Sequence, residues 1–154
     1  MCKVIFLDVD GVLNSMNFYD RLKAEGVPAS EANYALDPKA ADVLAKVVQS
    51  TGAWIVVSST WRLHEKHMGY LTKHLQSFGL SVADVTPHLN TERGDEIKAW
   101  LEKHPDVTAY AILDDDSDMG DLMPHLVQTS FQTGLQRTHA LKLMNLLNPK
   151  VMSP

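Results

Sequence analysis

Residues 4–14 read VIFLDVDGVLN, an apolar run that ends on two aspartates, Asp8 and Asp10, with Gly11 directly after them. A strand buried on both faces does not tolerate charge, so carboxylates at its end are expected where the chain leaves the sheet. A glycine at that point lets the backbone turn sharply and come close to a ligand. These residues are therefore candidates for chemistry, and the alternative is a plain acidic turn after a strand.

Two further apolar runs end in the same way. Residues 53–57, AWIVV, lead directly into Ser58 and Ser59, and residues 109–113, AYAIL, lead into the acidic stretch DDDSD of residues 114–118. Each run has the length and the unbroken hydrophobicity of a strand in a parallel sheet. The same pattern of a buried strand followed by polar residues therefore occurs three times along the chain.

Segments with helical spacing separate these runs. Asp37 is a favourable N-cap, Pro38 suits the first helical position, and an apolar stripe follows until Gly52 ends the helix. Further helices are expected over 17–25, 63–78, from 93 onward and over 141–147, with short strands over 80–85 and 126–129. This alternation predicts an α/β fold, a three-layer sandwich whose mostly parallel central sheet is covered on both faces. Trp54 and Trp100 are expected in the core.

Length and composition indicate one domain, expected to span residues 1–154. The chain is 45% hydrophobic, which is enough to bury a single core. Its net charge of -5 argues against a broad nucleic-acid surface but leaves room for a local basic patch. The single cysteine, Cys2, excludes an internal disulfide and is typical of a reducing compartment. Without a membrane-spanning apolar run or a leader pattern, we expect a soluble, cytoplasmic protein.

In a parallel sheet all strands end at the same edge, which is where open α/β sheets bind ligands. Asp8 and Asp10 should therefore meet one or more of Asp114, Asp115 and Asp118 at this edge. The repulsion among these carboxylates is relieved by a hard divalent cation with oxygen ligands, and Mg²⁺ is the natural candidate.

A phosphate ester is the substrate class that best matches such a cluster, because Mg²⁺ in proteins commonly shares its site with phosphate oxygens. Ser58, Ser59 and Arg93 could supply the hydrogen bonds and the positive charge that a phosphate needs.

With these residues in place, the chain resembles the phosphatases of the haloacid dehalogenase (HAD) superfamily. Residues 8–13, DVDGVL, resemble the first motif of the superfamily, and the strand that ends at Ser58 resembles the second. Arg93 stands where the third motif normally has lysine, and residues 112–115, ILDD, resemble the paired acids of the fourth. The motifs occur in the expected order over residues 3–135, and together they are far more specific than any one of them. The resemblance implies a Rossmann-like fold.

The resemblance also implies roles for the site residues. Asp8 would attack phosphorus to form an aspartyl-phosphate, while Asp10 would protonate the leaving oxygen and then activate water. Ser58 would hydrogen-bond the transferring phosphoryl group, and Arg93 would balance its charge. The magnesium ligands would be Asp8, the backbone carbonyl of Asp10, and the acids of the fourth motif, Asp114 and Asp115.

The arginine in the third motif is a departure from the superfamily pattern. A guanidinium is a planar fork and not a compact ammonium, so reach and geometry differ between the two side chains. Lys98, further along the same helix, is the nearest substitute. Arg93 is favoured because Gly94 follows it and the apolar face of the helix starts at Ile97.

Many members of the superfamily have a cap domain over the site, but the two insertion points are short here. Residues 15–36 allow a helix and a loop, and residues 63–92 are needed for the core. An uncovered site admits bulky substrates, such as a nucleic-acid end or a phosphorylated protein. We expect Gly11, Ser59 and Arg62 to contact the substrate.

A looser resemblance links the chain to the phosphatase domains of polynucleotide 3'-phosphatases and RNA repair proteins. It rests on residues 58–62, SSTWR, residues 93–97, RGDEI, and residues 113–116, LDDD. In this interpretation Arg62 would hold a phosphodiester backbone and Trp61 would stack on a base.

Two other functions remain open at this point. A response-regulator receiver also gathers acids at the edge of a parallel sheet, but its phosphoacceptor follows a middle strand instead of the first one. A noncatalytic relative that binds phosphate for regulation is the second alternative, and the intact acids argue against it. Turnover separates them, because an enzyme releases many phosphates per chain.

Overall fold

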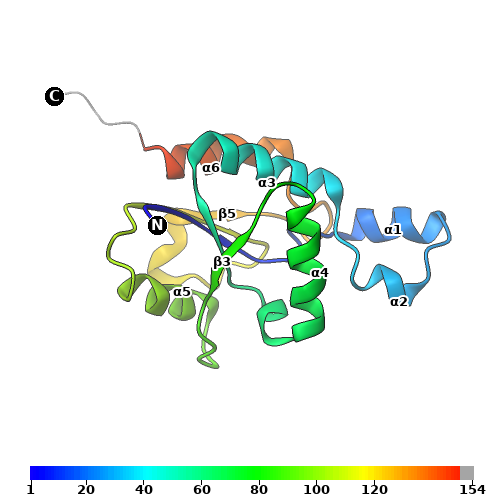
Figure 1. Ribbon diagram of the computed structural model, residues 1–154, viewed down its shortest axis with the longest axis horizontal. Coiled ribbons are helices and arrows are strands. Elements are labelled where there is room, and N and C mark those ends of the chain that lie inside the picture. Colours follow the sequence, from blue (N-terminus) through cyan, green and yellow to red (C-terminus); the bar gives the residue numbers. More distant parts are fainter. Residues whose placement is uncertain (150–154) are drawn as a thin grey trace.

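The computed structural model describes residues 1–149, so the last residues of the predicted 1–154 domain lie outside it. It contains a five-stranded sheet between layers of helices (Figure 1). The strands are β1 (Lys3–Leu7), β2 (Trp54–Val57), β3 (Val82–Val85), β4 (Ala109–Asp114) and β5 (Leu126–Gln128). Every neighbouring pair is parallel, in the order β3-β2-β1-β4-β5. The prediction of an α/β fold with a parallel sheet is confirmed.

Helices connect the strands largely as the sequence predicts. They are α1 (Met16–Ala24), α2 (Ala29–Ala32), α3 (Pro38–Thr51), α4 (Glu65–Gln76), α5 (Arg93–Glu102) and α6 (Ala140–Leu147), with short 3-10 turns η1 (Thr60–Leu63), η2 (Gly120–His125) and η3 (Arg137–His139). Between β1 and α3 the chain forms only the short helices α1 and α2, which project from one end of the molecule (Figure 1). Within residues 1–149, the expectation of no substantial cap domain is confirmed.

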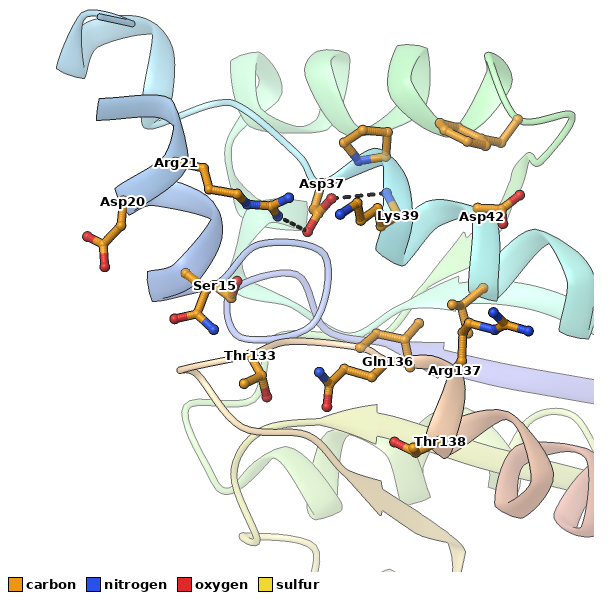
Figure 2. Close-up of a pocket in the computed structure, with 15 residues that line it drawn as sticks. Ser15, Asp20, Arg21, Asp37, Lys39, Asp42, Thr133, Gln136, Arg137 and Thr138 are labelled. Atoms are coloured by element: carbon orange, nitrogen blue, oxygen red, sulfur yellow. Dashed lines mark hydrogen bonds and ion pairs between the residues drawn. The ribbon is translucent and has the colours of Figure 1, made fainter. Parts of the chain in front are cut away.

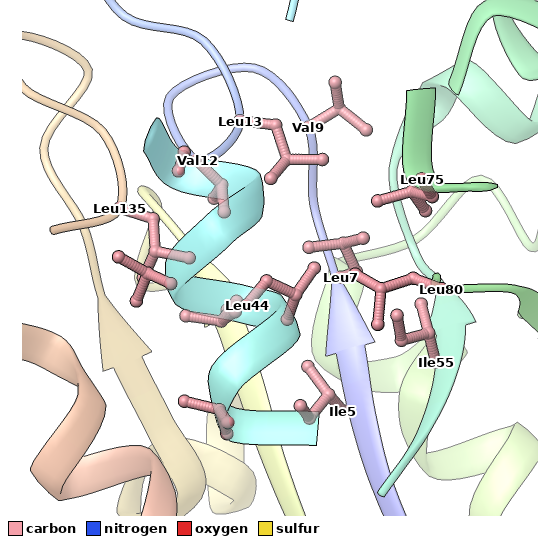
Figure 3. Packing of buried hydrophobic residues seen from close by; sticks show 14 of the residues in the cluster. Ile5, Leu7, Val9, Val12, Leu13, Leu44, Ile55, Leu75, Leu80 and Leu135 are labelled. Carbon is pink, nitrogen blue, oxygen red and sulfur yellow. The ribbon is translucent and has the colours of Figure 1, made fainter. Parts of the chain in front are cut away.

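The central position of β1 explains its unbroken hydrophobicity. Ile5 and Leu7 point to one face of the sheet and pack in a cluster with Leu44 of α3 (Figure 3). Val4 and Phe6 point to the other face, where α5 covers them. Since all four strand residues are fully buried, the first position that can carry charge is the one after the strand. Packing of β1 in the core thus determines that the first charged residue after the buried strand is Asp8.

The ends of α3 follow the sequence signals. The Asp37 carboxylate accepts a hydrogen bond from the Lys39 backbone N–H at 3.0 Å and caps the helix, with Pro38 in its first turn. Gly52 ends the helix in the left-handed conformation. The residues that the sequence indicates as the ends of α3 are therefore its ends in the structure.

One core prediction is wrong. Trp100 is buried and packs edge-to-face on Phe6, with ring centroids 5.4 Å apart. Trp54, in contrast, is 51% exposed. It begins β2 and contributes to neither hydrophobic cluster, so an apolar run does not bury its first residue automatically. Among residues 1–149, no helix combines the length and the apolar character that crossing a membrane requires.

Candidate active site

The carboxyl edge of the sheet brings the three predicted motif ends together. Asp8 follows β1, Ser58 follows β2 and Asp114 ends β4, and β1 is paired with both of these strands. The ladder extends into the site, because Asp8 N–H donates to the Leu113 carbonyl at 2.9 Å and Ser58 N–H donates to the Leu7 carbonyl at 3.0 Å. The backbone of each motif end is therefore fixed by the neighbouring strand.

Three carboxylates meet at this edge. Asp8, Asp114 and Asp115 each offer an oxygen atom, and these atoms lie within 4.8 Å of one another. Burial, followed by the charge of Asp8, raises the pKa of Asp114 well above its usual range. The same two causes raise the pKa of Asp115. Asp8 and Asp114 are buried and Asp115 is half-buried. Carboxylate oxygens that repel one another have the donor chemistry that a hard divalent cation requires, so these residues fit a metal site.

Arg93 reaches the same carboxylates from the first turn of α5. Its Nη1 lies 3.1 Å from Asp8 Oδ1 and 2.8 Å from Asp114 Oδ2. Burial alone would lower the pKa of this guanidinium, but the charges of Asp8 and Asp114 outweigh burial and raise it. Lys98, the alternative for the third motif, is exposed and lies 3.8 Å from Asp121. The geometry favours Arg93.

A close contact holds α5 at this position. Gly94 N–H donates to the Asp118 carbonyl at 3.0 Å, and Arg93 N–H donates to the Asp118 carboxylate at 3.2 Å. A Cβ at position 94 would lie 2.6 Å from backbone atoms of Met119. Only glycine lets the helix approach the acidic loop this closely, and the approach brings the Arg93 side chain to the acids.

Asp10 lies outside the carboxylate cluster and is exposed. Trp61 Nε1–H donates to its Oδ2 at 3.2 Å, and the Asn14 amide donates to its Oδ1 at 2.9 Å. The Asn14 side chain also accepts a hydrogen bond from the Gly11 N–H at 3.0 Å. One amide side chain therefore binds two consecutive residues of the turn, Asp10 and Gly11. The Asp10 carboxylate is thus held in a fixed orientation beside the cluster.

Sequence reasoning missed Asn14 and Thr129 as parts of the site. Thr129 follows β5, donates its hydroxyl hydrogen to the Gly11 carbonyl at 2.6 Å, and pairs its N–H with the Asp114 carbonyl. The rule applied to the other strands, that polar residues after a strand end reach the site, would have found Thr129. Asn14 has no comparable signal beyond its place at the end of the first motif.

The two predicted serines have different surroundings. Ser59 caps η1, because its hydroxyl accepts from the Trp61 N–H at 3.1 Å. Ser58 is fully buried, and its hydroxyl has no hydrogen-bond partner within the described chain; the same holds for Thr86 after β3. Buried polar atoms are nearly always hydrogen-bonded, so these two hydroxyls indicate that a further hydrogen-bonding group binds at this edge of the sheet.

Arg62 does not have the surroundings expected of a substrate contact. Its side chain is 2% exposed, and it donates to the Glu96 carboxylate at 3.0 Å and to backbone carbonyls. Those carbonyls belong to Ser58, Ser59, Thr86 and Pro87, at 2.9 to 3.1 Å. With its donors occupied, this guanidinium ties the loops after β2 and β3 to α5. Trp61 is likewise buried and donates to Asp10, which does not support base stacking on its face.

The conformation of Gly11 predicts that a side chain at this position destabilises the protein. Gly11 has a φ of +80°, and a Cβ there would overlap the Asp115 carboxylate, with Asp115 Cγ only 2.5 Å away. Gly11→Ala should therefore lower the free energy of unfolding by about 2–4 kcal/mol, from left-handed strain and overpacking together. Urea unfolding of the variant and the wild type measures this difference in free energy.

Gly26 provides a matched control for this substitution. It has the same φ of +80°, but no atom lies within 4 Å of the position that a Cβ would take there. Gly26→Ala should cost only the strain, about 1–2 kcal/mol. Equal losses in the two variants would show that Gly11 does not make room for Asp115.

A separate hollow of about 1090 Å³ lies between α1, the start of α3 and the 133–138 segment (Figure 2). Its charged residues include Arg21, which pairs with Asp37 at 3.1 Å, and Lys39. None of the clustered acids and neither Ser58 nor Arg93 lines it. The hollow therefore lies apart from the candidate active site, which is defined by the converging charged groups at the sheet edge.

Comparison with known families identifies the class of domain. The family of the HAD domain in Swiss Army Knife RNA repair proteins matches residues 4–140, and the chain belongs to this family. It is therefore a hydrolase domain of the HAD superfamily, the superfamily that the motif pattern predicts. No curated protein and no solved structure matches the chain.

Proposed function

We propose that the protein is a Mg²⁺-dependent phosphomonoesterase in which Asp8 forms an aspartyl-phosphate intermediate. The main supporting observation is the position of Asp8, a buried carboxylate fixed by the central strand, with Arg93 bound to one oxygen and Asp114 and Asp115 close by. These groups combine a nucleophile with positive charge and metal-ligating oxygens in one place.

The reaction has two displacements. An Asp8 oxygen forms a bond to phosphorus while the ester P–O bond breaks, and Asp10 gives its proton to the leaving oxygen. Asp10 then takes a proton from water, the water oxygen attacks phosphorus, and the Asp8–phosphorus bond breaks to release phosphate. The bonds from Trp61 and Asn14 orient the Asp10 carboxylate for both proton transfers.

Other residues neutralise charge and position the phosphate. The ion pair between Arg93 and Asp8 uses Oδ1, which leaves the second oxygen free of the guanidinium. The Ser58 hydroxyl, which has no partner among residues 1–149, can donate to a phosphoryl oxygen. Bound by Asp8, Asp114 and Asp115, Mg²⁺ would supply the positive charge that keeps these acids ionised and offsets the charge of the phosphate.

A bulky substrate is proposed because only α1 and α2 stand in the place of a cap. The family takes its description from RNA repair proteins that contain such a domain. A phosphorylated nucleic-acid end, in particular a 3'-phosphate, would fit an uncovered site. Sugar phosphates, nucleotides and phosphopeptides are the comparison substrates.

The proposed function predicts metal-dependent turnover. With Mg²⁺, the protein should release many phosphates per chain from a 3'-phosphorylated oligonucleotide, and a chelator should remove the activity. A phosphate-release assay across the substrate panel measures this. Release of at most about one phosphate per chain would instead favour a receiver or a phosphate-binding module.

Metal binding has a second readout that does not require activity. Mg²⁺ should raise the melting temperature of the chelator-treated protein, because a ligand that binds only the folded state stabilises it. The increase should be much smaller in Asp115→Asn, which removes one of the clustered charges. An equal increase in both proteins would place the metal elsewhere.

A further inference from the structure

A row of ring side chains in contact with one another leads from Asp10 to α4. Trp61, which donates to Asp10, contacts His67 with ring centroids 4.9 Å apart. His67 contacts Tyr34 at 4.9 Å, and Tyr34 stacks on Tyr70 at 4.8 Å with an interplanar angle of 19°. Three successive ring contacts thus connect the candidate general acid with an exposed tyrosine.

This row ends in a hollow of about 540 Å³ between the α2 region and α4. Tyr34, Tyr70, Lys66 and Lys73 line it, together with His74 and the acid Glu31. Lys66 Nζ lies 4.7 Å above the Tyr34 ring, and Tyr70 is 47% exposed. The chain has a net charge of -5, so two lysines beside the exposed Tyr70 ring differ from its overall charge.

We propose that this hollow binds the nucleotides next to the phosphorylated end of a single-stranded nucleic acid. A base would stack on Tyr70, and backbone phosphates would pair with Lys66 and Lys73. We name the four residues Tyr34, Lys66, Tyr70 and Lys73 the stacking surface. The inference deepens the proposed function, on which it rests for the direction of the strand.

That direction follows from the role of Asp10. The group that protonates the leaving oxygen must lie on the leaving-group side of phosphorus. The body of the substrate therefore continues past Asp10, and Trp61 and His67 connect that position to the stacking surface. A strand end entering the site would pass over this part of the surface, with Trp61 buried beneath it.

The chemistry of the surface matches single strands in particular. Every base has a π-face, so stacking on tyrosine is tolerant of sequence, and unpaired bases are free to stack. Lysine pairs with phosphate as a point charge and does not read sequence. The rings of Tyr34 and Tyr70 already stack on each other, so little side-chain freedom remains to be lost on binding.

The experiment compares binding and turnover in matched variants. Tyr70→Ala removes the exposed ring, whereas Tyr70→Phe keeps it. Lys66→Ala/Lys73→Ala removes the charges, and Lys46→Ala/Lys103→Ala removes two exposed lysines outside the surface. Binding is measured by fluorescence anisotropy with an unphosphorylated single-stranded oligonucleotide. Turnover is measured as the ratio of kcat/KM for the phosphorylated oligonucleotide to kcat/KM for a small aryl phosphate.

Tyr70→Ala should weaken binding about tenfold and lower the kcat/KM ratio by about the same factor, the loss expected for one stacked base. Tyr70→Phe should remain close to wild type. The double variant Lys66→Ala/Lys73→Ala should reduce the slope of log affinity against log salt by roughly 0.7 for each lysine, and the control pair should not.

The outcomes separate this inference from the proposed function. If Tyr70→Ala hydrolyses the small aryl phosphate and binds the oligonucleotide as tightly as the wild type does, the inference about the stacking surface is wrong. The proposed phosphatase activity would then still hold. Binding that depends on Tyr70, in a protein without turnover, would support the surface and overturn the catalytic proposal. A melting curve for each variant identifies any loss that comes from unfolding.

Discussion

Asp8→Asn should abolish turnover while the protein stays folded. The amide cannot act as the nucleophile that forms the acyl-phosphate, so kcat should fall by at least about a thousandfold, as happens when a covalent nucleophile is removed. The fold should persist, because the substitution keeps the shape of the side chain and removes one of the clustered negative charges. Phosphate release measures the first expectation and circular dichroism the second.

Asp20→Asn is a matched control, since it makes the same chemical change at an exposed aspartate of α1. It should retain turnover close to that of the wild type. Full activity in Asp8→Asn would assign the nucleophile to another residue. Loss of activity accompanied by unfolding would leave the role in catalysis to be measured by trapping the phosphorylated residue of the wild-type protein.

Arg62→Ala should be the most destabilising of these substitutions, lowering the free energy of unfolding by about 3–5 kcal/mol, the range for breaking a buried ion pair. The truncation leaves the Glu96 carboxylate buried without its cation and also leaves the carbonyls around it without their donor. Urea unfolding measures the loss. The expected effect on stability is what separates a structural arginine from a substrate contact.

Glu96→Gln tests the same network more gently. The amide keeps an oxygen for Arg62 and for the Leu89 N–H, and only the charge is lost. It should cost less than Arg62→Ala, about 1–3 kcal/mol. An Arg62→Ala protein with wild-type stability and a raised KM for phosphorylated substrate would return Arg62 to the substrate site.

The fold was largely predictable because its signals are local. The apolar runs of β1 and β4 and the caps of α3 identify elements without any knowledge of distant contacts, and the parallel rule then brings their ends together. Trp54 shows the limit of this approach. Burial depends on which helices cover a strand, and the strand's own sequence does not contain that information.

The site was only partly predictable for a similar reason. Asp8, Asp114, Asp115 and Arg93 could be gathered at one edge from topology and motif order alone. Arg62 could not be distinguished from a substrate contact, because its role depends on carbonyls of two loops and on Glu96, which is distant in sequence. A charged residue next to a motif is a candidate for function. Whether its side chain contacts a ligand or the protein itself depends on its hydrogen-bond partners in the fold.

The shortness of the α1–α2 region has a consequence for the proposed catalytic cycle. Enzymes that close a lid over the substrate assemble their site during closure, and opening often limits product release. Here no large element is available to close within the described residues, so the ladder of backbone bonds around Asp8 and Ser58 must hold the site in its working arrangement before substrate arrives. Entry and departure then depend on diffusion and on binding strength at the rim.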